Sequence, residues 1–120
     1  MAFRDRILYG MDLAINGNIP VAAGMSSSSA LVVSTTEAAT ALHDLDVAPT
    51  QFVNFCGEGE WFVGTRGGSS DHAAMKYGAK GTINHVKFHE FELLDQIQFP
   101  DTHRMVVCNS YMQAKKAAGA

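Results

Sequence analysis

The residues best suited to chemistry lie in a run of small and hydroxyl side chains at positions 20–31, PVAAGMSSSSAL. Glycine and alanine let a backbone approach a ligand closely, and a run of serines before an Ala-rich apolar stretch indicates a helix N-terminus. The N–H groups at such an end attract an anion, and serine hydroxyls are ligands for a hard cation such as magnesium. A solvated serine linker that caps an ordinary helix explains the same residues equally well. The run lacks the motifs of a Walker loop and of a nucleophile elbow.

A second candidate site lies at positions 60–72, EWFVGTRGGSSDH. Its glycine pair precedes Asp71 closely, which places a carboxylate at the start of a short helix, where the helix dipole favours negative charge. Such a carboxylate can accept a proton or a hydrogen bond from a hydroxyl substrate. Taken alone, Asp71 is more simply explained as a helix N-cap, and Glu60 as a surface carboxylate on a helix.

These two segments must be positioned by helices and strands in mixed order. Apolar spacing predicts helices at 3–11, from the serines to 43, at 50–62 and at 71–77, with Thr50 and Ser110 as candidate caps of the second and of a last helix. Alternation or short apolar runs predict strands at 12–18, 82–88, 91–99 and 104–109. The sequence therefore predicts the α+β class.

Composition excludes several classes of protein. Hydrophobic residues make up 47% of the 120 residues and only three are proline, which is not the composition of a disordered chain. The net charge of −3 argues against a nucleic-acid partner held through its phosphates. Two cysteines fit a reducing compartment, and no apolar run approaches the length of a membrane span. We therefore expect a cytoplasmic protein with neither a nucleic-acid nor a membrane partner.

Together, the two segments resemble the GHMP small-molecule kinases, and within them the galactokinase and N-acetylgalactosamine kinase branch. Positions 20–31 are similar to the family's Pro-x-x-x-Gly-Leu-Ser-Ser-Ser-Ala-Ala phosphate loop, with Met25 in the leucine place and Ser29 in an alanine place. Positions 60–71 have the spacing of its acidic loop, and VCNS at 107–110 and KAA at 116–118 resemble the family's sequence beyond that loop. The resemblance implies the ATP-binding N-terminal domain of that family, a two-layer mixed sheet packed against helices.

The resemblance also implies an activity, the ATP- and Mg²⁺-dependent phosphorylation of a monosaccharide at its anomeric hydroxyl, as in galactose metabolism. Under it, Asp71 contacts the acceptor hydroxyl as base or orienting group, and Gly68 lies beside it at the sugar. Ser28 and Glu60 would hold the metal. The triphosphate would be cradled by the residues of the serine loop, Gly24, Met25, Ser26, Ser27, Ser28 and Ser29. A non-catalytic nucleotide- or sugar-binding sensor domain of the same fold is the alternative.

The chain also departs from the family pattern. Galactokinases commonly carry Gly-Ile-Met-Asp-Gln where this chain has GSSDH at 68–72, which leaves the identity of the sugar open. The family's N-terminal sugar-binding signature, Gly-Arg-x-Asn-Leu-Ile-Gly-Glu-His, and its glycine-rich C-terminal signature do not occur in these 120 residues. We therefore expect residues 1–120 to be a partial N-terminal domain of a larger kinase, without its C-terminal domain and inactive by itself.

Three histidines and an arginine have weaker signals. His85 and His89 are four residues apart, but on a predicted strand they are better explained as surface histidines than as zinc ligands. His72 either helps to hold Asp71 or a substrate hydroxyl, or lies at the surface. Arg66 is either a phosphate-neutralising residue or a solvated loop residue.

Four further residues are expected in the core. Cys56 and Cys108 are predicted to be small core residues, since both lie in apolar surroundings along the chain. Trp61 and Phe62 are predicted to pack behind the glycine loop, GTRGGSS at 64–70, with stacking on a sugar as the less favoured alternative for Trp61.

Overall fold

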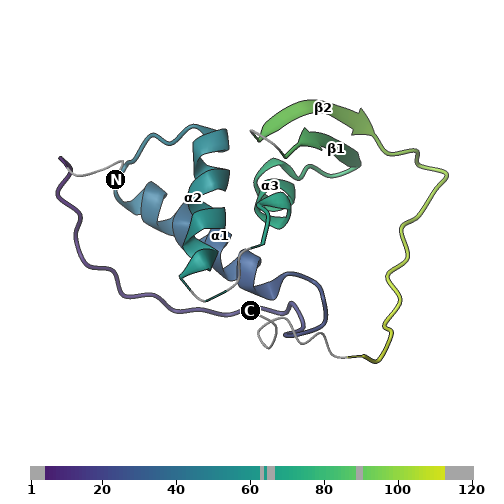
Figure 1. Ribbon diagram of the computed structural model, residues 1–120, viewed down its shortest axis with the longest axis horizontal. Coiled ribbons are helices and arrows are strands. Elements are labelled where there is room, and N and C mark those ends of the chain that lie inside the picture. The colour runs from purple at the N-terminus through teal and green to yellow at the C-terminus, as the bar shows by residue number, and fades with distance from the viewer. Residues whose placement is uncertain (1–4, 63, 65–66, 89–90, 113–120) are drawn as a thin grey trace.

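Three helices and one pair of strands make up the regular secondary structure of the residues that the structure describes (Figure 1). The computed structural model describes residues 5–62, 64, 67–88 and 91–112. The elements, in chain order, are α1 (Ser27–Leu42), α2 (Pro49–Trp61), α3 (Ser70–Tyr77), β1 (Thr82–Lys87) and β2 (Glu92–Gln98). This confirms the α+β class. Within the described ranges the sheet has two antiparallel strands, in place of the mixed sheet that the resemblance implied.

The ends of the helices follow from local chemistry. α1 begins directly after the loop at 20–26, as predicted. α2 begins at Pro49, whose fixed φ suits the first helical position, so the N-cap is Ala48 and not the predicted Thr50. α3 ends before Gly78, where an added Cβ would lie 2.6 Å from the carbonyl oxygen of Ala74. A residue larger than glycine would therefore have to displace the end of this helix.

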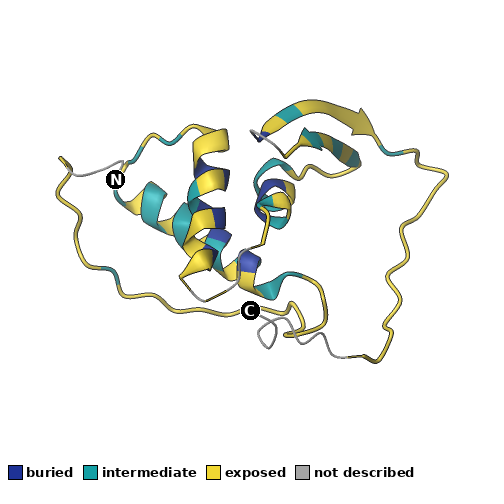
Figure 2. Cartoon of the chain, in the orientation of Figure 1, coloured by how far each residue is buried: buried dark blue, intermediate teal, exposed yellow. Residues whose placement is uncertain are grey.

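The core consists of two small clusters that meet at α2. In the first, Val33 of α1 packs against Phe52 and Cys56 of α2. In the second, Val53 of α2 packs against Ala73 of α3 and against Phe91, which immediately precedes β2. Figure 2 shows the buried residues gathered where the three helices face one another. The three helices thus pack against one another, and α2 contributes to both clusters.

Polar contacts add to this packing at α3. Lys76 pairs with Glu37 of α1 at 2.5 Å between Nζ and Oε1, and its Nζ lies 4.2 Å from the ring centroid of Phe52. Gln96 of β2 donates from Nε2 to the carbonyl oxygen of Tyr77 at 2.8 Å. These contacts tie α3 to both neighbouring helices and to the sheet.

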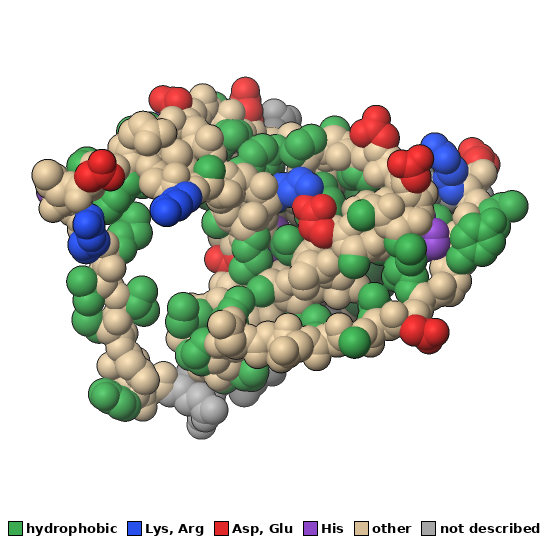
Figure 3. Space-filling view, turned by 180° about the vertical axis from the view of Figure 1, so that it is seen from behind, with side chains coloured by type: hydrophobic (Ala, Val, Ile, Leu, Met, Phe, Trp, Pro, Cys, Tyr) green, Lys and Arg blue, Asp and Glu red, His purple; other side chains and the backbone are tan. Residues whose placement is uncertain are grey.

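The segments before α1 and after β2 are extended and exposed, which corrects several predictions. Residues 5–18 form neither the predicted helix at 3–11 nor the strand or hairpin at 12–18. The predicted strand at 104–109 is not formed either, and Met105, Val106 and Val107 are 71%, 81% and 77% exposed. Figure 3 shows hydrophobic side chains along the narrow C-terminal segment, with an open gap between it and the body. Such apolar patterns form strands only with a partner strand and helices only with a surface to pack on.

The predicted last helix does not begin at its expected residues. Tyr111 and Met112 are not helical, and the remainder of that prediction lies outside the described residues. Of the helices that the structure describes, none is both long enough and apolar enough to span a bilayer; α1 has 16 residues.

Candidate active site

The serine loop leads into a helix whose first amides have no carbonyl partner within that helix. The loop turns through left-handed residues, with φ of +73° at Gly24 and +52° at Ser26. Ser26 is the N-cap residue of α1, yet its side chain does not cap the helix, and the first helical hydrogen bond runs from Ala30 N–H to Ser26 O at 3.0 Å. The amides of residues 27–29 therefore lack a carbonyl partner within the helix. No acidic residue of α1 lies in this first turn, and the N–H groups at such a helix end favour an anion.

The side chain of Ser26 instead reaches the second candidate segment. Its hydroxyl donates to Asp71 Oδ2 at 2.6 Å, across 45 residues of sequence. Asp71 lies in the first turn of α3, as predicted, and is half-buried. The N-cap of α3 is Ser69, so the simpler explanation of Asp71 as an N-cap does not hold. The structure thus joins the serine loop to the carboxylate that the sequence singled out.

A second contact between the two segments is buried. The Ser29 hydroxyl donates to Glu60 Oε1 at 3.0 Å, and the two residues are 2% and 9% exposed. Glu60 Oε2 lies 3.6 Å from Nε2 of His72, which is 1% exposed. Glu60 is therefore not a surface carboxylate, and His72 is not at the surface. The side chains of Ser29 from α1, Glu60 from α2 and His72 from α3 thus lie together.

The members of the serine loop differ in their surroundings. Ser28 is exposed in the first turn of α1, and it is Ser29, its neighbour, that contacts Glu60. Ser27 is half-buried, whereas Gly24 and Met25 are exposed. The resemblance assigned the hydroxyl that acts with Glu60 to Ser28, but four consecutive serines carry no local signal of which one contacts Glu60 directly.

The donor set fits a magnesium ion that is shared with a nucleotide. The described part of the chain contains no group of three or more His, Cys, Asp or Glu side chains that could hold a metal by themselves. Mg²⁺ is commonly bound by one or two protein carboxylates together with substrate phosphates. Glu60 and the serine hydroxyls, beside a helix N-terminus of the kind that favours anions, offer that arrangement.

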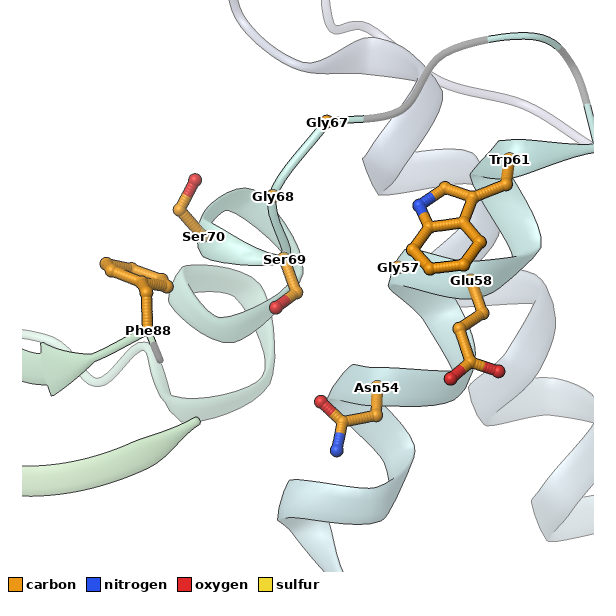
Figure 4. A pocket seen from close by; sticks show the side chains of 9 residues that line it. All are labelled: Asn54, Gly57, Glu58, Trp61, Gly67, Gly68, Ser69, Ser70 and Phe88. Atoms are coloured by element: carbon orange, nitrogen blue, oxygen red, sulfur yellow. The ribbon is translucent and has the colours of Figure 1, made fainter. Parts of the chain in front are cut away.

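A pocket of about 360 Å³ opens between α2 and the glycine loop (Figure 4). Gly67, Gly68, Ser69 and Ser70 form one side of it, so the structure places the predicted sugar-contacting residue Gly68 in its wall. Trp61 and Phe88 lie on opposite sides of the space. Trp61 and Phe62 are 53% and 94% exposed, so the prediction that they pack in the core is wrong. Trp61 is the last residue of α2 and Phe62 is its C-cap residue.

The remaining predictions have mixed outcomes. Cys56 is buried, as predicted, and burial raises the pKa of its thiol. Cys108 is exposed because the strand predicted around it is not formed, which corrects that prediction. His85 is exposed, as expected of a surface histidine. His89 and Arg66 lie outside the described residues.

Comparison with known proteins identifies the family of this chain. The model of the family described as GHMP kinases N terminal domain matches residues 1–79, which include the serine loop, Glu60 and Asp71. The chain belongs to the GHMP kinase family. No solved structure matches it.

Its relatives support the galactokinase branch of this family. The chain is 29% identical to a galactokinase of Dictyostelium discoideum over 109 residues, which cover 91% of the chain and 22% of that protein. It is 27% identical to a galactokinase of Candida parapsilosis over 115 residues, which cover 89% and 23%. It is 28% identical to a galactokinase of Pasteurella multocida (strain Pm70) over 111 residues, which cover 92% and 29%. The chain thus spans about a quarter of the length of these relatives.

Proposed function

We propose that this chain carries the phosphate-binding and acceptor-activating part of a sugar kinase, which transfers the terminal phosphoryl group of ATP to the anomeric hydroxyl of a monosaccharide. The supporting observation is the hydrogen bond between Ser26 and Asp71. It joins a helix end suited to phosphate with a carboxylate suited to a hydroxyl. A phosphoryl donor and its acceptor need to lie together in this way, since positioning supplies much of the rate in phosphoryl transfer.

The proposed ATP site is the loop from Gly24 to Ser29. Three amides of the first turn lack helical partners and the dipole of a 16-residue helix ends there. Small side chains, with glycine at a positive φ, let phosphate oxygens approach the backbone. Neutralisation by backbone donors explains how a chain with a net charge of −3 can hold a triphosphate.

The proposed metal ligands are Ser28 and Glu60. When bound, Mg²⁺ would neutralise charge on the phosphates and fix their orientation. Glu60 is held by Ser29, so its carboxylate is oriented before any metal arrives. Ser28 is exposed at the helix start, where its hydroxyl is accessible to a metal–nucleotide complex.

Asp71 is proposed to orient the acceptor hydroxyl and to receive its proton. The hydrogen bond from Ser26 to Oδ2 fixes the direction of the carboxylate, and Oδ1 is the oxygen that it leaves for a substrate hydroxyl. Gly68, three residues earlier, is proposed to contact the sugar from the wall of the pocket at α2. The exposed indole of Trp61 in the same pocket offers an apolar face for a sugar ring.

The decisive experiment compares Asp71→Ala with Asp101→Ala in the protein at its full natural length. The substrates are ATP, Mg²⁺ and a panel of hexoses, and ³¹P NMR identifies the sugar 1-phosphate. We expect Asp71→Ala to lower kcat by about 10²–10⁴-fold, the usual contribution of general base catalysis. Asp101 is an exposed carboxylate beyond β2 and serves as the control, with unchanged turnover.

Three results would contradict the proposal in different ways. Turnover of Asp71→Ala within a few-fold of wild type would remove the role of Asp71. A phosphorylated position other than the anomeric hydroxyl would change the reaction. Nucleotide binding without turnover on any hexose would favour a sensor domain of the same fold.

A further inference from the structure

His72 is a buried polar side chain that the proposed reaction does not use. It lies one residue after Asp71 in α3 and is 1% exposed. Neither of its ring nitrogens has a hydrogen-bond partner in the part of the chain that the structure describes. Burying an imidazole without such a partner costs stability, and an apolar side chain of similar size would fill the same space without this cost. The presence of a histidine here therefore calls for an explanation other than packing.

The position of the His72 ring relative to Glu60 supplies an explanation for the buried histidine. Nε2 lies 3.6 Å from Glu60 Oε2, while Ser29 donates to the other oxygen, Oε1, at 3.0 Å. The distance of 3.6 Å is beyond hydrogen-bond length, and a small rotation of either side chain would close it. Contacts of this kind are often long in a free enzyme and shorten when the ligand binds. The carboxylate thus lies between one donor from α1 and one potential donor from α3.

We propose that His72 is a positioning residue, which holds the Glu60 carboxylate in the orientation that the metal–nucleotide complex requires. The proposal rests on the function proposed above. A donor at Oε1 restrains that oxygen, and a second donor at Oε2 restrains the plane of the carboxylate as well. Groups that hold a metal-binding carboxylate in this manner commonly change metal affinity or activity by about 10–100-fold when they are removed.

The test compares two substitutions of the same buried residue. His72→Leu fills the space and removes the donor, and His72→Gln keeps an N–H donor at similar reach. Mn²⁺ binding to the full-length protein with a non-hydrolysable ATP analogue, followed by EPR, measures metal affinity without turnover. We expect His72→Leu to weaken Mn²⁺ binding by about 10–100-fold. His72→Gln should remain within a few-fold of wild type. The matched control is His85→Leu, the same exchange at an exposed histidine of β1, with unchanged binding.

Thermal unfolding of the same variants separates positioning from packing. A positioning role predicts that His72→Leu melts at the wild-type temperature or above it, because a buried unpaired ring has been removed, although metal binding is weaker. A purely structural role predicts the reverse, a lower melting temperature with unchanged Mn²⁺ affinity. That second result would overturn the proposal, as would loss of Mn²⁺ affinity in His72→Gln equal to that in His72→Leu.

The contact itself is tested independently of the kinase assignment. In the free protein, Glu60→Gln should shift the imidazole ¹⁵N resonances of His72 and leave those of His85 unchanged. An unshifted His72 would overturn the proposed contact. If wild-type protein binds no Mn²⁺–nucleotide complex, the proposed function fails and with it the effect on the metal, while the NMR result still decides whether His72 and Glu60 are coupled.

Discussion

The hydroxyl of Ser29 should stabilise the free protein measurably, whereas that of Ser28 should not. Ser29 is 2% exposed and donates to the carboxylate of Glu60, which is 9% exposed. If this hydrogen bond is lost, water cannot easily take the place of either partner. Hydrogen bonds to charged groups contribute about 1.5–3 kcal/mol. Ser29→Ala removes one donor and leaves little empty space. We therefore expect it to lower the free energy of unfolding by about 1.5–3 kcal/mol.

Ser28→Ala is the matched control for this measurement. Both exchanges replace serine by alanine in the first turn of α1, so the gain in helix propensity cancels in the comparison. Ser28 is exposed, and its loss should change the unfolding free energy by less than about 0.5 kcal/mol. Urea unfolding at neutral pH without nucleotide or metal gives both values. Equal destabilisation by the two exchanges would refute the pairing of Ser29 with Glu60.

Two other predictions concern α2. Gly59→Ala should stabilise the protein by about 0.5–1 kcal/mol, because alanine restricts the unfolded chain and its Cβ meets only Val32 at an ordinary 3.8 Å. Gly57→Ala should gain less or lose stability in the same urea assay, since its Cβ would lie 3.1 Å from Ser69 Cβ. Burial raises the pKa of the Cys56 thiol, so the unfolded state releases this proton first and stability falls above about pH 9. The slope is at most about 1.4 kcal/mol per pH unit, and unfolding of Cys56→Ala between pH 8 and 11 should lack this component. A slope identical in the two proteins would contradict it.

Local sequence patterns were sufficient to predict the start of α1, the end of α3 and the strand β1. The serine run predicts the start of α1, and Gly78 predicts the end of α3. Alternation at 82–88 predicts β1, which the structure has as Thr82–Lys87. In each case the signal lies within a few residues of the feature. Pro49 shows the limit of such local signals. Thr50 is a good N-cap residue, but proline favours the first helical position, so α2 begins at Pro49 with Ala48 as its N-cap.

The contacts of the site could not be predicted because they join residues far apart in sequence. Ser29 and Glu60 are separated by 31 residues, and no local pattern encodes the face that α1 turns toward α2. Successive residues of a helix point about 100° apart, so of two neighbouring serines only one can contact a given side chain of the facing helix directly. The packing of Val33 against Phe52 and Cys56 decides that this residue is Ser29. His72 is buried where α3 packs against the other two helices, and its sequence neighbours suggest no such environment.

The site contacts described above are held by the packing of the helices and do not involve the extended segments before α1 and after β2. Ser26, Ser29, Glu60, Asp71 and His72 all lie on or beside the three helices, and their contacts named above involve no residue before position 20 or after β2. The two hydrophobic clusters fix these helices relative to one another without the extended segments. Because each helix contributes one side chain to the meeting point at Glu60, a shift of any one helix disturbs the carboxylate. The orientation of the proposed metal ligand is thus a direct consequence of helix packing.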